Sequence, residues 1–261
     1  MIVIWLALLL TASGAVEHYN RAHAFFQQQK FVEANEALDA ALTADPDYVP
    51  ALTLKGKLAM AFNRFDVARA AFARAARLSP ESAYAQFMLG FFYYVDNDFV
   101  QAVPVLERAR KLDPCDPRAT LYLAMSHEGL ARPDLAIPLY EQTIELEKRR
   151  GQPSPDTHTA CGRLLFTLGR YADAARQVAR VLEIDPNSRD GHYEQGRLFL
   201  EQGRYAEASA HGEKALANQG PGTTDRQIHF LLARAYGKLG KKDLAQFHLQ
   251  KFQASPATLR R

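Results

Sequence analysis

The chain has 261 residues, of which 48% are apolar and 23% are charged, and its formal net charge is +3 at pH 7. This length suits one large domain or two small ones, and the composition excludes both a disordered chain and an all-apolar membrane protein. Two cysteines, Cys115 and Cys161, stand far apart and outside any Cys-x-x-Cys or Cys/His cluster, so neither a disulfide framework nor a zinc site is predicted.

The N-terminal segment, residues 1–15, begins with an uninterrupted apolar run from Met1 to Leu10 and continues with small residues. This order is typical of a signal peptide, and the run is shorter than the ~20 residues that span a bilayer. We therefore expect residues 1–15 to be a signal peptide and the protein to be exported, either to the periplasm or out of the cell. Because no Lys or Arg precedes the run, an uncleaved membrane anchor formed by residues 1–16 is the alternative.

The remaining chain, residues 16–259, repeats itself with a period of 34 residues. Pro46, Pro80 and Pro114 recur at this interval, and Pro186 rejoins the series after a four-residue insertion. The repeats are expected near residues 15–48, 49–82, 83–116, 117–150, 155–188, 189–222 and 226–259. A fixed period of this length indicates a repeat architecture.

Certain positions within each repeat are restricted to a few residue types. Position 20 is always Ala and position 8 is always Gly or Ala, which lets two helices approach closely where they cross. Position 17 is aromatic in five repeats, and position 15 is Gly or Asn in five, residue types that tolerate the left-handed conformation at a helix end. Each repeat is therefore predicted to form a helix, a tight turn and a second helix.

The segment LGFFYYVDNDFVQAVPVLERARKLDP, residues 89–114, resembles the tetratricopeptide repeat, whose outline is W-x-x-L-G-x-x-Y followed by spaced Ala residues and a final Pro. The resemblance implies an all-α fold, a right-handed superhelical α-solenoid of about seven helix-turn-helix repeats. It further implies that the first helices line a concave groove, in which members of this family bind extended peptides or partner helices.

Groove-facing residues are predicted at positions 2, 5, 9, 12 and 13 of each first helix, on the side away from the positions that pack inward. The resulting candidates are Tyr84, Phe87, Phe91, Tyr94, Met125, Arg163, Tyr193, Arg197, Phe230 and Arg234. The aromatic residues of the third repeat are expected to face solvent and so to need a partner or a second copy. The three arginines, all at position 9, form a ladder suited to carboxylate or phosphate groups, unless nearby acids such as Glu194 neutralise them.

Catalytic and metal-binding chemistry is not predicted. Histidine recurs at position 4, but such side chains should pack between helices, where hydrogen-bonded histidines are more common than zinc ligands. The sequence has no phosphate-binding loop, serine-hydrolase elbow or His-Glu-x-x-His motif, so no enzyme activity and no cofactor are expected.

These patterns favour a non-catalytic scaffold that binds a protein or peptide segment, with acidic groups on the partner as one option and a role in cell-envelope assembly. The alternative is a structural protein that associates with itself. Binding of nucleic acid through the basic residues 226–261, with eight Lys or Arg and one acid, is the weakest hypothesis, and no nucleic-acid partner is expected.

Overall fold

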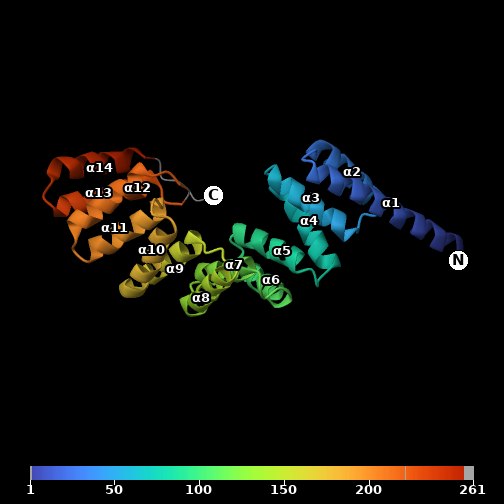
Figure 1. The fold of residues 1–261 in the computed structure, drawn as a ribbon, viewed down its shortest axis with the longest axis horizontal. Coiled ribbons are helices and arrows are strands. Elements are labelled where there is room, and N and C mark those ends of the chain that lie inside the picture. The colour runs from blue at the N-terminus through green and yellow to red at the C-terminus, as the bar shows by residue number, and fades with distance from the viewer. Residues whose placement is uncertain (1, 221, 256–261) are drawn as a thin grey trace. The chain divides into compact units, whose positions relative to one another are not determined.

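The computed structural model describes the backbone of residues 2–220 and 222–255, and within these ranges the side chains from residue 14 onward. The described residues form fourteen α-helices and no strand (Figure 1), which confirms the all-α class. The chain divides into two compact units, Met1–Arg132 and Pro133–Arg261.

The first unit contains seven helices: α1 (Ile2–Gln27), α2 (Phe31–Ala44), α3 (Val49–Ala61), α4 (Phe65–Leu78), α5 (Ala83–Val95), α6 (Phe99–Leu112) and α7 (Pro117–Gly129). The second unit also contains seven: α8 (Pro133–Arg149), α9 (Pro155–Thr167), α10 (Tyr171–Ile184), α11 (Arg189–Glu201), α12 (Tyr205–Ala217), α13 (Asp225–Lys238) and α14 (Lys242–Ala254). The division between the units falls inside the fourth sequence repeat, between α7 and α8.

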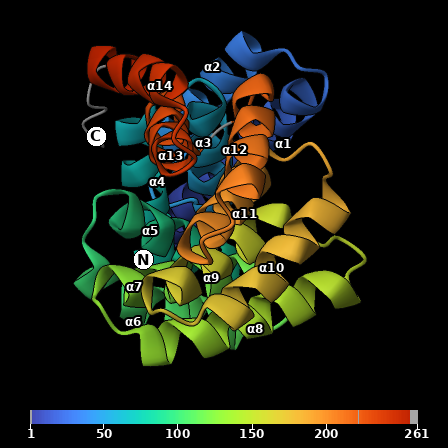
Figure 2. The ribbon, with the colours of Figure 1, turned by 90° about the vertical axis from the view of Figure 1, so that its left-hand side faces the viewer.

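Helices pack in consecutive pairs, as the repeat pattern predicts. In the second unit α9 packs on α10, α11 on α12, and α13 on α14 (Figure 2). The first helices also touch one another, because α11 contacts both α9 and α13. Side chains on these three first helices can therefore contribute to one surface.

The turn inside every repeat contains one residue in the left-handed conformation, always at position 15. These residues are Gln29, Asn63, Asn97, Ala131, Gly169, Gly203 and Gly240, with φ between 55° and 74°. Glycine and asparagine adopt this conformation at low cost, but a β-carbon makes it unfavourable. The sequence pattern predicted a turn in every repeat, but its Gly or Asn signal for the left-handed residue was present in five repeats and absent at Gln29 and Ala131.

Close helix contact explains the small residues at positions 8 and 20. A β-carbon added at Gly56 would lie 2.6 Å from the ring of Phe72, and one added at Gly90 would lie 2.6 Å from Leu106. The Ala at position 20 has no exposed surface in six of the seven repeats. In the second and third repeats a large core side chain of the second helix thus occupies the space that a larger residue at position 8 would need.

The N-terminal helix α1 continues from the apolar run into the first repeat without a break in its backbone. The side chains of residues 1–13 lie outside the described residues, so the signal peptide or anchor at residues 1–15 stays a prediction. None of the helices in the described ranges combines the length and the apolar character needed to cross a membrane.

Replacing Ala131 with Gly should stabilise the protein by about 1 kcal/mol, because it removes the β-carbon that makes the left-handed conformation unfavourable. The reverse change, Gly169→Ala, meets no atom within 4 Å and should destabilise by a similar amount through conformation alone. Denaturant midpoints of both variants check this prediction. A lower midpoint for Ala131→Gly would contradict it.

Candidate functional site: a groove across three first helices

A groove of about 690 Å³ lies in the second unit and is lined by α9, α11, α13, the end of α14 and the segment before α13. We call it the arginine groove. Five residues predicted from the sequence line it together: Arg163, Tyr193, Arg197, Phe230 and Arg234. They come together because each stands at position 5 or 9 of a first helix, and these helices contact one another.

The three arginines of the ladder differ in what they can offer to a ligand. Arg197 donates to Glu194 at 2.6 Å, and its guanidinium lies 3.9 Å from the centre of the Phe166 ring. Arg234 is half exposed and lies 3.7 Å from Glu201. The Arg163 guanidinium is exposed and forms no hydrogen bond or ion pair with the described residues of its unit. Arg163 and Arg234 are therefore the cations open to an anionic group.

The Glu194 carboxylate lies under the ladder and is almost fully buried. Burial raises the pKa of Glu194 above its usual value, and the positive charges of Arg197 and Arg163 oppose this shift. The pair holds Arg197 against the rings of Phe166 and Tyr193, where the guanidinium is 5.8 Å from the Tyr193 ring centre. Arg197 therefore serves as a fixed part of the groove wall.

An aromatic pair from two helices forms another part of the groove. The ring centres of Phe230 and Phe252 are 5.1 Å apart, and the Arg226 guanidinium lies 4.3 Å from the centre of the Phe252 ring. Phe252 and Arg226 were not predicted, because the search for groove residues considered only particular positions of first helices. Phe252 belongs to the second helix α14, and Arg226 lies in the first turn of α13.

The loop before α13 forms a wall that the buried Arg189 holds in place. Its guanidinium donates to the Thr223 carbonyl at 2.8 Å and the Asn218 carbonyl at 2.9 Å, and it pairs with Asp225. The neighbouring Asp190 accepts from the Thr223 amide at 2.7 Å. The three-residue shift of the repeat in NQGPGTTD indicates this loop in the sequence, but it does not predict that the loop lies beside the groove.

Among the aromatic residues of the third repeat, Phe87 is buried, which corrects the expectation that it faces solvent, whereas Tyr84, Phe91 and Tyr94 are partly exposed. Phe87 is only 6% exposed, and the Arg118 guanidinium lies 4.9 Å from its ring centre. Phe91 and Tyr94 each have a ring centre 5.1 Å from that of Tyr122 on the next first helix. Tyr122 stands at position 6, outside the set of positions assigned to the groove, and its ring fills the space between them.

The other two candidates of the first unit are half buried. Tyr84 is flanked by the Lys57 ammonium, 4.7 Å from its ring centre, and by the ring of Phe72 at 5.8 Å. Met125 lies on α7. In the first unit, therefore, no large apolar patch is formed by the candidate residues.

The histidines at position 4 of the fifth, sixth and seventh repeats pack between the two helices of their repeats, as predicted, and each meets position 23. The contacts join His158 Nδ1 to Gln177 Oε1 at 2.7 Å, His192 Nδ1 to His211 Nδ1 at 3.1 Å, and His229 Nδ1 to His248 Nδ1 at 3.0 Å. No group of three or more His, Cys, Asp or Glu side chains in the described ranges could hold a metal ion.

The fold and the groove define an all-α repeat protein with a mixed basic and aromatic surface. A model of the tetratricopeptide repeat matches residues 19–83, 53–114, 93–155 and 159–222, and another model of the same repeat matches residues 227–254. These matches cover most of the sequence, so the chain belongs to the tetratricopeptide repeat family.

Solved structures with the same fold share little sequence with this chain. A tetratricopeptide repeat protein from Parabacteroides merdae is 16% identical, with 95% of each chain covered and a TM-score of 0.69. YrrB, described as having an unusual peptide-binding site, is 22% identical over 80% of this chain and 100% of its own, with a TM-score of 0.58. MamA is 23% identical over 62% of this chain and 92% of its own, with a TM-score of 0.55. Among curated proteins, no sequence matches the chain.

The histidine pairs should make the second unit sensitive to acid. Burial lowers the pKa of His211 to about 4, with His192 and Lys214 adding to the effect, and burial also lowers the pKa of His192, His229 and His248. The unfolded chain therefore takes up more protons below pH 6.5 than the folded one. Stability should be complete above pH 6.5 and fall between pH 6.5 and about 4.

The double variant His211→Gln and His248→Gln copies the His158–Gln177 contact of the fifth repeat and removes two of the titrating groups. Its free energy of unfolding should fall less between pH 7 and pH 4.5 than that of the unaltered chain, by at most about 1.4 kcal/mol per pH unit for each histidine removed. If stability falls with pH equally steeply in the two proteins, the histidine pairs are not the source of the acid sensitivity.

Replacing Arg189 with Ala should release the loop that walls the groove, because three acceptors lose a buried charged donor. Hydrogen exchange at the amides of residues 222–224 should become roughly tenfold faster or more. Arg180→Ala, which removes an exposed arginine paired with Glu183, is the matched control and should leave these amides unchanged. Slow exchange in the Arg189 variant would show that other contacts hold the loop.

Proposed function

We propose that this protein is a non-catalytic scaffold that binds a peptide or protein segment in the arginine groove. The observation that carries the proposal is the gathering of five predicted residues, three of them arginines, around one groove on three contacting helices. Proteins of this repeat family generally act as interaction scaffolds, and the likeness to YrrB is consistent with peptide binding.

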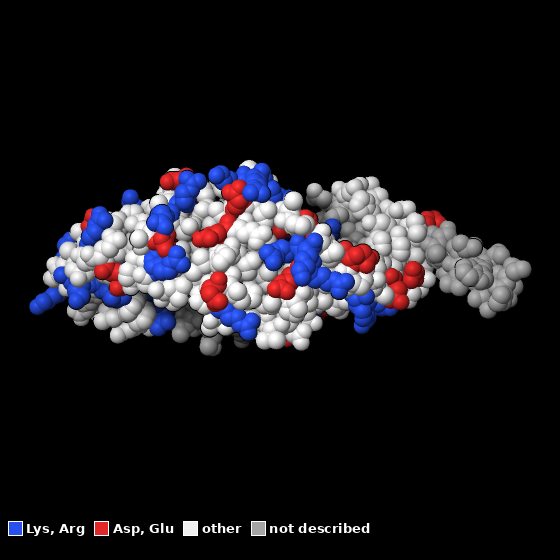
Figure 3. All heavy atoms as spheres, turned by 90° about the horizontal axis from the view of Figure 1, so that it is seen from below, with Lys and Arg blue, Asp and Glu red and all other residues white. Residues whose placement is uncertain are grey.

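The groove chemistry favours a segment that carries both acidic and aromatic or large apolar side chains. Arg163 and Arg234 can each hold a carboxylate, while the rings of Phe230 and Phe252 can pack against an apolar side chain. On the face of the molecule drawn in Figure 3, Lys and Arg are interspersed with Asp and Glu among the described residues. We assign selectivity for an acidic segment to the groove because Arg163 and Arg234 line it.

Reversing two groove charges tests this function. The variant Arg163→Glu with Arg234→Glu should bind labelled 12-residue peptides containing Glu and Phe about tenfold or more weakly than the unaltered chain, since each site then repels a carboxylate. Arg176→Glu with Arg180→Glu makes the same charge change on α10, outside the groove, and should have little effect. Fluorescence anisotropy measures both, and equal affinities for the two double variants would disprove the site.

We further propose that the protein is exported and acts in assembly at the cell envelope, with residues 1–15 as a cleaved signal peptide. The composition of that segment supports the proposal, and membrane anchoring through residues 1–16 is its alternative. Sequencing the N-terminus of the protein from its native cells should find a start near Ala15 or Val16. A soluble form that retains Met1 would contradict export.

Self-association is a second candidate function, and exposed apolar side chains on α14 favour it. Leu244, Phe247 and Leu249 are each more than 40% exposed on this last described helix. A second copy could cover them. Sedimentation over a range of concentrations should then show a dimer that is lost in Phe247→Ser, whereas a monomer at all concentrations would exclude this function.

A further inference from the structure

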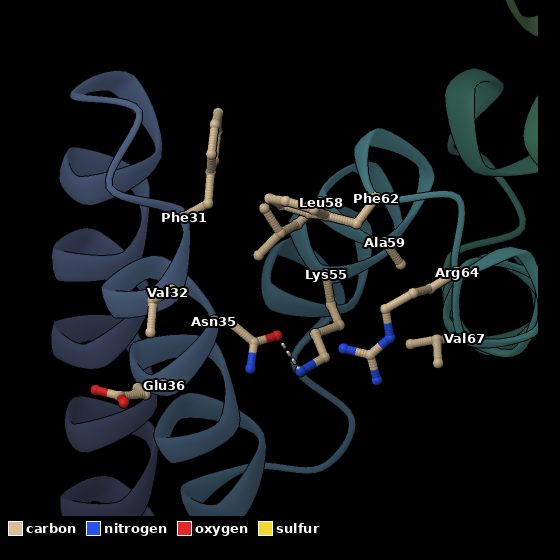
Figure 4. A pocket seen from close by; sticks show the side chains of 10 residues that line it. All are labelled: Phe31, Val32, Asn35, Glu36, Lys55, Leu58, Ala59, Phe62, Arg64 and Val67. Carbon is tan, nitrogen blue, oxygen red and sulfur yellow. Dashed lines mark hydrogen bonds between the residues drawn. The ribbon is translucent and has the colours of Figure 1, made fainter.

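A second hollow, of about 340 Å³, lies in the first unit between α2, α3 and the start of α4 (Figure 4). It belongs to the junction between the first and second repeats and is separate from the residues of the arginine groove. Its apolar lining comes from Phe31, Val32, Leu58, Phe62 and Val67. Two of these are far more exposed than large apolar side chains usually are, since Val32 is 71% and Phe62 52% exposed.

Two cations face this hollow. The Lys55 ammonium donates to Asn35 Oδ1 at 2.8 Å and to Asp39 Oδ1 at 2.6 Å, which compensates its charge. The Arg64 guanidinium points toward the same space in Figure 4, yet it forms no hydrogen bond or ion pair with any described residue. The Glu36 carboxylate, at the other side of the hollow, points away from both. One positive charge thus lacks a counterion beside an apolar hollow.

The fifth and sixth repeats pair the arginine at position 16 with an acid three residues later, whereas in the fourth repeat Leu135 follows Arg132 at this spacing. Arg170 donates to Asp173 at 2.8 Å, and Arg204 donates to Glu207 at 2.9 Å. In the second repeat the corresponding residue is Val67. The substitution leaves the Arg64 guanidinium without a partner and adds an apolar side chain to the hollow.

The next junction also closes the equivalent space with an ion pair. Between the second and third repeats, Arg69 at position 21 contacts Asp96 at position 14 of the following repeat at 2.6 Å. At the first junction these two positions hold Asn35 and Phe62. The first junction therefore lacks the position-16 ion pair of the fifth and sixth repeats and the ion pair of the second junction, and it presents apolar side chains in their place.

We infer that this hollow is a second binding site, for a protein segment that buries one large apolar side chain against Leu58 and Phe62 and places a carboxylate on Arg64. The volume is at the lower end of the range for ligand sites and holds one such side chain. The unpaired cation selects an acidic neighbour on that segment. A scaffold with two separate sites can hold two segments at once, which goes beyond the arginine groove.

The test starts with a display library of random 12-residue peptides, selected on the full chain carrying Arg163→Glu and Arg234→Glu, so that the arginine groove contributes little. Failure of this selection leaves the proposed function of that groove untouched. The enriched peptides should contain Asp or Glu within a few residues of Leu, Met or Phe. Replacing that acid with its amide should weaken binding about tenfold.

Two variants introduce side chains that already occur at the equivalent positions of other repeats, so both should preserve the fold. Val67→Asp supplies the acid found at Asp173, and Asn35→Arg with Phe62→Asp supplies the pair formed by Arg69 and Asp96. Both should bind the selected peptides at least about tenfold more weakly, with melting temperatures close to that of the parent chain. Ala70→Asp places the same charge on an exposed position of α4 outside the hollow and should bind normally.

Several results would overturn the inference. One is a selection that yields no binders, or binders without an acidic residue. Another is equal loss of affinity in Val67→Asp and Ala70→Asp, which would indicate a general charge effect. A third is a parent chain that sediments as a dimer while the variant Asn35→Arg with Phe62→Asp sediments as a monomer. The occupant of the hollow would then be a second copy of the chain.

Discussion

Close contact between the paired helices within each unit is the constraint on which the rest of this structure depends. At some crossing points a Gly of the first helix meets a large core side chain of the second, as Gly56 meets Phe72. A larger residue at position 8 would separate the helix axes, and the wider spacing would also change how the neighbouring repeats stack on that pair. The restricted positions of the repeat are therefore set by packing and carry little information about partners.

Function has to be sought where repeats differ from one another. Position 9 changes along the chain and becomes arginine in three successive repeats, which produces the arginine groove. The first junction has Asn35 and Phe62 where the next has the ion pair of Arg69 and Asp96, and a hollow lies beside these two residues. In both places the helices pack as in the other repeats. The side chains that packing does not restrict determine the charge and apolar character of the surface.

Much of the fold could be predicted because the period is regular and its restricted positions have simple steric causes. The second helix of every repeat begins at position 17, and the predicted groove arginines share one surface. Contacts between repeats were harder to predict, because they depend on which side chain fills a space. Tyr122 covers the third-repeat aromatics, and Arg189 reaches across 36 residues to Asp225. Neither contact has a signature in a single repeat.

Hydrogen exchange of the full chain, with and without a bound peptide containing Glu and Phe, tests the central claim most directly. The account predicts slower exchange in α9, α11, α13 and residues 222–224, with the outer second helices α10 and α12 unchanged. Protection confined to α10 and α12, or no protection anywhere in the second unit despite saturating peptide, would contradict it.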